Sequence, residues 1–243
     1  MKKVFATTKN VREFVAGMDA VRGDGRRKAE MGLVYGAYGT GKTVTAQKYA
    51  ADHGLTYVAA VDGMTRRSLL AAIIGELGYS PAWATDAAFH QAVDLLLEPG
   101  RCLIVDEVDY LIQTGVIETL RSLYDYTACP IVMVGMAPDL PQKLKARWPW
   151  LFDRCGTLVR FSTFTAEELG EMAEQLCEVA FEASALALVR AKSEGRLRPA
   201  LRAFERAEAV ARTNRLERIG PEHLRGIWSN DDEPGAAGRR VRR

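Results

Sequence analysis

The residues with the clearest chemical signature are 36–43, which read GAYGTGKT. They fit the pattern G-x-x-x-x-G-K-[ST] of a phosphate-binding loop, in which glycines let the backbone curl so that successive N–H groups point at phosphate oxygens. Lys42 would add a positive charge beside the β- and γ-phosphates, and Thr43 would offer its hydroxyl to Mg²⁺. The motif predicts a nucleotide site formed by Gly36, Ala37, Tyr38, Gly39, Thr40, Gly41, Lys42, Thr43 and Val44.

The segments beside this loop decide between a phosphate site and a glycine-rich turn that matches the pattern by chance. The apolar run 31–35 precedes the loop and a helical pattern over 44–51 follows it. Strand, loop and helix in this order are what phosphate binding requires, because the positive end of the helix then faces the anion. The context therefore favours nucleotide binding over the accidental turn.

A second chemical pair ends the segment RCLIVDE at residues 101–107. An apolar strand that ends in two acids, downstream of a phosphate loop, is the arrangement that ATP hydrolysis needs. Asp106 would hold Mg²⁺ through water, and Glu107 would orient and polarise the attacking water. A strand that ends in two acids by chance is the alternative, which is common by itself but rare together with the loop.

Strand-like and helical segments alternate around these motifs, which indicates an α/β fold with a parallel sheet covered by helices on both faces. The predicted strands cover 31–35, 55–61, 101–107, 130–135 and 158–161. The first predicted helix covers 8–21 and presents one apolar face, formed by Val11, Phe14, Val15 and Met18. Residues 108–112 are read as the start of a connection to a helix over 116–126. After residue 163 the segments are helical, over 166–177, around 182–192, from 195 to 212 and over 221–228.

These segments divide the chain into four expected parts. They are an N-terminal helix and linker (1–30), an α/β core (31–163), a small helical lid (164–228) and a disordered basic tail (229–243) that ends in GRRVRR. The tail has nothing to bury, and it is either a passive solubilising segment or a contact for DNA phosphates or a partner protein.

The composition of the 243 residues is that of a soluble globular protein, with 48% hydrophobic and 26% charged residues. The 33 basic and 31 acidic residues nearly cancel, so any basic surface must be local. No apolar run is as long as a membrane span, which needs about 18 residues, and no signal-peptide core follows the N-terminal lysines. A cytoplasmic protein is therefore expected. The four cysteines form no C-x-x-C pair, and we expect reduced, buried thiols.

The loop, the acid pair and the strands at 130–135 and 158–161 together resemble a AAA+ ATPase module that spans residues 1 to about 225. The resemblance implies a P-loop NTPase fold with a five-stranded parallel sheet, a small C-terminal helical lid, and ATP and Mg²⁺ as cofactors. It implies a catalytic group of Lys42, Glu107, Arg154 and Arg198, with Thr43 and Asp106 at the metal.

Two of these arginines are assigned only by their positions. Arg154 matches the arginine that reaches from one subunit into its neighbour's site, with Arg147 as the runner-up and a surface ion pair as the alternative. Arg198, three residues after a glycine, resembles the second sensor of the lid, and Arg202, one turn on, is the alternative.

The end of the fourth strand departs from that superfamily. A polar residue usually stands there, whereas this chain reads Val134-Gly135-Met136. Either hydrolysis is slow or another group substitutes for the missing side chain, and slow turnover suits a nucleotide-controlled switch.

Within the superfamily the chain resembles the phage Mu transposition protein B family, the MuB-like and TnsC-like ATPases that select targets for transposition. This resemblance implies a filament of many copies on double-stranded DNA, a DDE transposase as partner, and a bacterial host cell. The DNA-contacting residues would be Arg66 and Arg67 in the loop 65–67, with Lys143 and Lys145 as a second candidate segment. For Arg66 and Arg67, an exposed helix start is an equal alternative.

Two other functions share the same ATPase core. A replicative helicase loader resembling the DnaC/IstB group would bind a helicase and prefer single strands. A AAA+ switch that remodels a protein partner would ignore DNA, and it ranks third because the sequence offers no anchor or partner domain for it.

Overall fold

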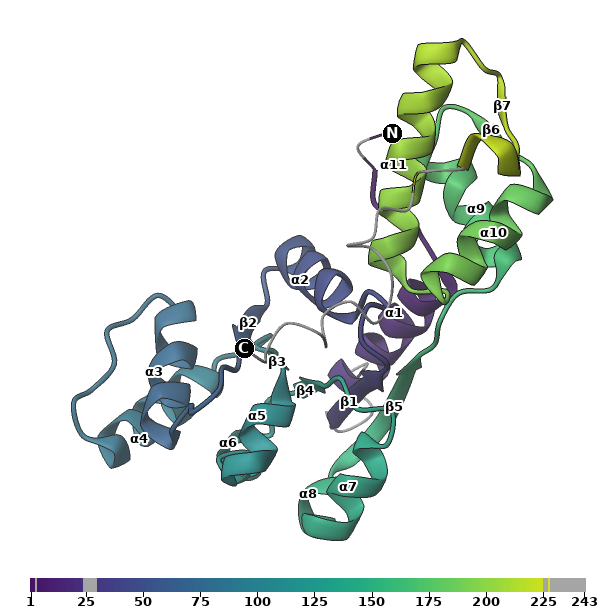
Figure 1. Ribbon diagram of the computed structural model, residues 1–243. Coiled ribbons are helices and arrows are strands. Elements are labelled where there is room, and N and C mark those ends of the chain that lie inside the picture. The colour runs from purple at the N-terminus through teal and green to yellow at the C-terminus, as the bar shows by residue number, and fades with distance from the viewer. Residues whose placement is uncertain (3, 24–29, 225–226, 228–243) are drawn as a thin grey trace, which may run out of the picture. The chain divides into compact units, whose positions relative to one another are not determined.

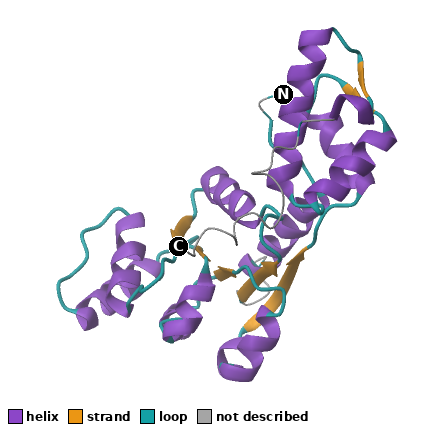
Figure 2. Cartoon of the chain, viewed as in Figure 1, coloured by secondary structure: helices purple, strands orange, loops and turns teal. Residues whose placement is uncertain are grey.

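The computed structural model describes residues 1–2, 4–23, 30–224 and 227 (Figures 1 and 2). It divides into two compact units. The sheet unit is Asn10–Phe161, and the helical unit combines Met1–Lys9 with the described part of Ser162–Arg243. The sequence prediction sets the border between core and lid at 163 and treats residues 1–30 as a part of their own. In the structure, the first nine residues group with the helical unit. The expected tail, 229–243, and most of the charged linker, 24–29, lie outside the described residues.

The sheet unit is built on five strands in the order β2-β3-β4-β1-β5. Every neighbouring pair is parallel. The strands are β1 (Met31–Gly36), β2 (Thr56–Ala59), β3 (Leu103–Asp106), β4 (Ile131–Val134) and β5 (Cys155–Phe161). The predicted α/β fold with a five-stranded parallel sheet is thus confirmed.

Helices cover both faces of this sheet (Figure 1). On one face lie α1 (Lys9–Arg22) and α2 (Lys42–His53). On the other lie α3 (Arg66–Glu76), α4 (Thr85–Leu96), α5 (Val108–Thr114), α6 (Glu118–Thr127), α7 (Leu140–Arg147) and α8 (Pro149–Phe152). The strands serve both layers because alternate side chains point to opposite faces: Val132 and Val134 join the first core, Ile131 and Met133 the second.

The buried face of α1 differs from the predicted one. Phe14 and Met18 are buried as expected, but Val15 is exposed. The buried positions of this helix are Asn10, Phe14, Gly17, Met18 and Val21. A side chain at Gly17 would overlap Val159 of β5, so the helix approaches the sheet along its glycine. A prediction based on apolar residues alone fails for this helix, because its closest contact with the sheet is made by Gly17, which has no side chain.

Other boundaries also differ from the sequence prediction. Residues 108–112 begin the helix α5 rather than a connection. β5 starts at Cys155 instead of 158, because it is an edge strand that pairs only with β1, and its first residues need not be apolar. The predicted helix over 221–228 is a single 3₁₀ turn, Pro221–Leu224, within the described residues.

The helical unit has its own core. Its elements are α9 (Ala166–Leu176), β6 (Ala180–Phe181), α10 (Ala183–Ser193), α11 (Leu197–Asn214), β7 (Arg218–Ile219) and the 3₁₀ turn η1. Leu169, Val189 and Phe204 are fully buried in this core. The N-terminal segment packs along it: the Lys2 N–H donates to the Leu176 carbonyl at 2.7 Å, and the amino group of Met1 pairs with Glu208.

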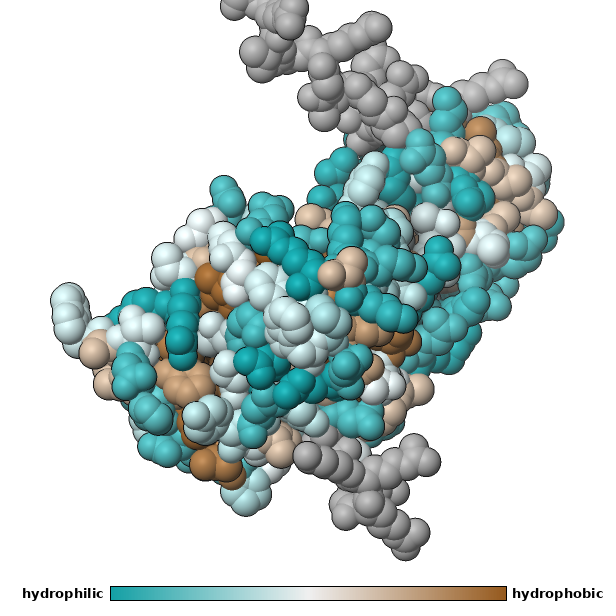
Figure 3. Space-filling model, turned by 90° about the horizontal axis from the view of Figure 1, so that it is seen from below, coloured by the Kyte–Doolittle hydropathy of each residue, from teal (hydrophilic) through white to brown (hydrophobic). Residues whose placement is uncertain are grey.

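Hydrophilic side chains cover most of the face shown in Figure 3, and hydrophobic ones occur there in small separate groups. Among the described residues, no helix combines the length and the apolar character that crossing a bilayer requires. The four cysteines are free, and three of them are buried. Burial raises the pKa of Cys102, Cys129, Cys155 and Cys177 to about 12, which makes these thiols poor nucleophiles.

Candidate nucleotide-binding site

The predicted phosphate loop connects the end of β1 to the start of α2, at the carboxyl end of the sheet. Gly36 has a φ of 145°, and a side chain there would overlap the carbonyl oxygen of Phe161 on β5. Gly41 has a φ of 98° and caps α2 without any side-chain hydrogen bond. The first N–H groups of α2 therefore meet no capping side chain, which is the arrangement that binds an anion.

Lys42 lies inside the curl of the loop and is buried. Its Nζ donates to the carbonyl oxygens of Gly36 and Ala37, both at 2.8 Å. Burial lowers the pKa of Lys42, while the charges of Asp106, Glu107 and Asp109 act in the opposite direction. The ammonium thus faces oxygen atoms of the loop, and phosphate oxygens would offer it stronger, charged acceptors.

Asp106 ends β3 and is 2% exposed. Its Oδ1 accepts a hydrogen bond from the Glu107 N–H at 2.7 Å. Its Oδ2 accepts one from the hydroxyl of Tyr57, on the neighbouring strand β2, at 2.8 Å. Both carboxylate oxygens are therefore held by protein donors, which fixes the orientation of the group.

Glu107 adopts the left-handed conformation, with φ 56° and ψ 36°. A residue with a side chain adopts this conformation at a cost of about 1–2 kcal/mol. Its Oε2 is buried and has no hydrogen-bond partner within the described part of the chain. Burial raises the pKa of Glu107, and the charges of Asp106 and Asp109 raise it further against the effect of Lys42. An unpaired carboxylate of raised pKa is suited to accept a proton from water.

Asp109 contacts the segment after β4, where the sequence lacks a polar side chain. Its Oδ2 accepts a hydrogen bond from the backbone N–H of Met136, two residues past β4, at 2.6 Å. A side chain at Gly135 would approach the same oxygen to 2.9 Å. Sequence reasoning missed both Asp109 and Tyr57. The signal that was available for Asp109 is its place in the sequence, two residues after the acid pair.

Arg154 lies far from its own loop. It precedes β5, and its carbonyl accepts from the N–H of Met31 at the start of β1, whereas the loop follows the end of β1. The six residues of β1 span about 17 Å at 3.3 Å per residue. The guanidinium pairs with both carboxylate oxygens of Asp125 and also donates to the Trp150 carbonyl. The runner-up, Arg147, is exposed, 5.4 Å from the ring centroid of Trp148.

The two lid arginines lie in the helical unit. Arg198 and Arg202 are exposed residues of α11. Gly195 shapes the turn before this helix: its φ is 68°, its carbonyl accepts from the Phe164 N–H at 2.8 Å, and a side chain there would overlap the Phe164 carbonyl. The glycine is therefore required for the turn that begins α11, and the sensor role of Arg198 stays a prediction.

The expected DNA-contacting residues lie on two separate helices. Arg66 and Arg67 form the first turn of α3, after the capping residue Thr65, rather than a free loop. Arg66 is exposed and stacks its guanidinium 4.9 Å from the ring centroid of Phe89, while Nη1 of Arg67 is buried. On α7, Lys143 and Lys145 are exposed, and Lys143 pairs with Asp139 at 3.1 Å. In Figure 1, α5 and α6 lie between α3 and α7.

The oxygen groups near the loop fit Mg²⁺. No cluster of three or more His, Cys, Asp or Glu residues within the described ranges would hold a metal by itself. Thr43 and Asp106 instead supply a hydroxyl and one oriented carboxylate at the end of the sheet where the loop lies. Mg²⁺ is usually coordinated by one or two protein oxygens together with substrate phosphates and water.

Comparison with known proteins identifies the class of this site. Residues 25–144 match the family model described as an AAA domain, so this part of the chain is an AAA-type P-loop ATPase domain. The nucleotide loop and the acid pair both lie inside the matched range. No curated protein sequence matches the chain.

Solved structures share the fold. The Aeropyrum pernix ORC2 protein is 18% identical, with a TM-score of 0.63, over 90% of this chain and 65% of that one. The Aeropyrum pernix ORC1 protein in complex with DNA is 20% identical, with a TM-score of 0.63, over 91% of this chain and 65% of that one. The Thermotoga maritima RuvB Holliday junction branch migration motor is 22% identical, with a TM-score of 0.61, over 92% of this chain and 69% of that one. This chain thus spans 65% of the two Aeropyrum proteins, and the similarity to all three concerns the fold.

Proposed function

We propose that this protein is a Mg²⁺-dependent ATPase that assembles in its ATP-bound state on double-stranded DNA and there recruits or activates a DDE transposase. The observation that carries the assembly is the position of Arg154. It lies about 17 Å from the loop along β1, which supports a role at the nucleotide of another copy instead of its own. A site completed by a neighbour ties hydrolysis to assembly.

The geometry supports the following roles at the nucleotide. The N–H groups of residues 36–44 and the ammonium of Lys42 would bind the β- and γ-phosphates. Thr43 and Asp106 would hold Mg²⁺, which when bound neutralises the charge that develops on the phosphate oxygens. Glu107 would orient the attacking water and accept its proton. Arg198, or Arg202 one turn on, would contact the phosphates from the helical unit.

Slow hydrolysis is part of the proposal. The end of β4 presents no polar side chain at Gly135 or Met136, and the nearest carboxylate, that of Asp109, is engaged with the backbone. Asp109 therefore holds the end of β4 in place through one oxygen of its carboxylate. An ATPase with this arrangement suits a switch whose ATP-bound state is long-lived.

The DNA-binding part rests on exposed cations and on a similar fold. Arg66 on α3 and Lys143 and Lys145 on α7 are exposed, with the half-buried Arg67 as the weakest of the four candidates. One of the similar structures, that of ORC1 from Aeropyrum pernix, is a complex with DNA. Cations of this kind contact phosphates irrespective of sequence. The transposase partner rests on the resemblance to the MuB-like and TnsC-like ATPases.

Negative-stain microscopy with duplex DNA tests the proposal, with a non-hydrolysable ATP analogue, ADP and no nucleotide compared in parallel. We expect filaments or rings on DNA only with the analogue. A preference for single-stranded DNA would instead support the helicase loader. Bare DNA under all three conditions, despite measured ATP binding, would overturn the DNA-binding part and leave a switch that acts on protein.

A further inference from the structure

A tyrosine hydroxyl is bonded to the first residue of the acid pair, and the ATPase motifs do not explain this bond. Tyr57 lies on β2, where it pairs in register with Ile104 of β3, two residues before Asp106. Because alternate residues of a strand share a face, Tyr57, Ile104 and Asp106 lie on the same side of the sheet. The Tyr57 hydroxyl reaches along this face and donates to Oδ2 of Asp106 at 2.8 Å.

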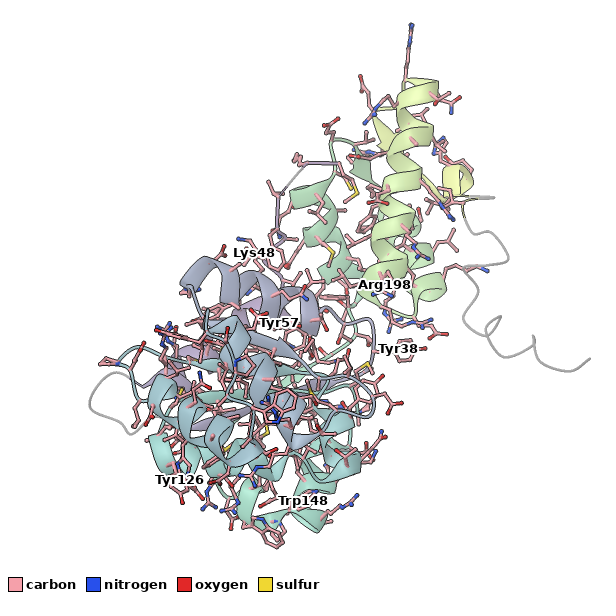
Figure 4. The ribbon with its side chains drawn as sticks, turned by 90° about the vertical axis from the view of Figure 1, so that its left-hand side faces the viewer. Tyr38, Lys48, Tyr57, Tyr126, Trp148 and Arg198 are labelled. Carbon is pink, nitrogen blue, oxygen red and sulfur yellow. The ribbon has the colours of Figure 1, made fainter. Side chains whose placement is uncertain are left out.

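The same hydroxyl is also held from the helix that follows the phosphate loop. Nε2 of Gln47 donates to the Tyr57 oxygen at 3.4 Å. Gln47 lies four residues after Thr43 on α2, so both residues lie on one side of that helix. Figure 4 shows Tyr57 beside α2, the helix that carries Lys48, and Tyr126 at a distance from it. Gln47, Tyr57 and Asp106 form a chain of hydrogen bonds from α2 through β2 to the end of β3.

This chain restricts the carboxylate of Asp106 in a specific way. Glu107 N–H occupies one acceptor site on Oδ1, and the Tyr57 hydroxyl occupies one on Oδ2. A carboxylate has about four acceptor sites, so one on each oxygen stays available. The Tyr57 hydroxyl therefore determines which acceptor sites of the Asp106 carboxylate stay available to other donors.

We propose that Tyr57 is a positioning residue for Mg²⁺, because its bond to Oδ2 of Asp106, supported by Gln47, orients the carboxylate toward the water ligands of the metal. The inference rests on the proposed function, in which Asp106 holds Mg²⁺ through water. Hydrogen-bonded partners of metal ligands commonly contribute 10- to 100-fold to metal affinity. Tyr57 would act at the low end of that range because it works through a water-mediated contact.

The test compares Tyr57→Phe with Tyr126→Phe, which removes the same hydroxyl from an exposed tyrosine elsewhere in the sheet unit. Binding of a fluorescent, non-hydrolysable ATP analogue is measured against Mg²⁺ concentration and again in EDTA. For Tyr57→Phe we expect the Mg²⁺ concentration at half-maximal binding to rise about 10-fold, with unchanged affinity in EDTA. Gln47→Ala should give a smaller rise, and Tyr126→Phe none.

Three outcomes overturn the inference. An unchanged Mg²⁺ requirement in Tyr57→Phe, while Asp106→Ala raises it, would remove Tyr57 from the metal site and leave the proposed function intact. An equal loss of affinity with Mg²⁺ and in EDTA would show that Tyr57 only supports the fold. An unchanged Mg²⁺ requirement in Asp106→Ala would overturn the proposed metal role of Asp106 and the inference together.

Discussion

Oδ2 of Asp109 accepts the backbone N–H of Met136 at 2.6 Å and thereby ties the first turn of α5 to the chain beyond β4. Asp109→Ala removes this bond and should lower the free energy of unfolding by about 1 kcal/mol. Asp109→Asn keeps an acceptor and should lower it less. Thermal unfolding of the two variants measures the difference, and equal losses would contradict a role for the hydrogen bond.

The same two variants test the electrostatics of Glu107. The charge of Asp109 raises the pKa of Glu107, so removing that charge should lower this pKa. The acid limb of the rate of ATP hydrolysis should then move to lower pH in both Asp109→Ala and Asp109→Asn, although the first loses more stability than the second. A pH profile of hydrolysis checks this, and an unmoved limb would mean that Glu107 is not the titrating base.

Lys42→Ala should weaken ATP binding by about 30-fold or more, because a buried charge on phosphate is typically worth 2–5 kcal/mol. Lys48→Ala is the matched control, since Lys48 lies on the same helix but is exposed and paired with Asp52 at 2.5 Å. Calorimetric titration with ATP compares the two. Similar losses in both variants, or retained ATP-dependent assembly in Lys42→Ala, would contradict the loop assignment.

Glu107→Gln should retain ATP binding and slow hydrolysis by on the order of 10²–10⁴-fold. The substitution should also stabilise the protein at neutral pH. Because the pKa of Glu107 is raised in the folded state, its contribution to stability is present below its ordinary value of 4.5 and is lost as pH rises through the folded value. The gain in Tm over the native protein should therefore be seen at pH 8 and shrink toward pH 4.5. A constant difference across this range would contradict the burial of an ionised carboxylate.

Gly36→Ala and Gly75→Ala should change stability in opposite directions. At Gly36 the new methyl group would overlap the Phe161 carbonyl in a left-handed backbone, which should cost about 2 kcal/mol or more. Gly75 lies within α3 with no atom within 4 Å of the added carbon, so alanine there should stabilise by about 0.4–1 kcal/mol. Chemical denaturation measures both, and a neutral Gly36→Ala would mean that the loop leaves β1 along another path.

Arg154→Ala should reduce hydrolysis by about 10³-fold or more in the DNA-assembled state and leave ATP binding by the isolated chain unchanged. Arg121→Ala is its control, because Arg121 pairs with the same Asp125 at 2.7 Å. Both half-exposed ion pairs should contribute less than about 1 kcal/mol to stability. Equal effects of the two substitutions on assembled hydrolysis would assign the loss to the ion-pair network instead of to Arg154.

The motifs that could be predicted from sequence are local ones. Residues 36–43 and the pair Asp106 and Glu107 carry their chemistry in consecutive positions. The alternation of apolar strand segments with helical segments likewise predicts the parallel sheet that the structure has. Tyr57 and Asp109 could not be found in this way. Tyr57 contacts Asp106, which lies 49 positions further along the chain, because their two strands pair; Asp109 contacts Met136, which lies 27 positions further.

Predictions failed where packing overrides hydrophobicity. The helical pattern makes Val15 a core residue, but the approach of α1 to β5 through Gly17 turns it outward. The sequence leaves Arg66 either in a loop or at an exposed helix start, and the capping box of Thr65 and Ser68 decides for the helix start. The first nine residues adjoin the N-terminal helix in sequence, whereas their hydrogen bonds go to residues beyond 170.

That placement means that the backbone runs between the two units twice, at 9–10 and at 161–162. The two units are therefore joined covalently at two places instead of one. Cleavage of the backbone at 9–10 would leave the part of the helical unit from Ser162 onward attached to the sheet unit, and cleavage at 161–162 would leave Met1–Lys9 attached.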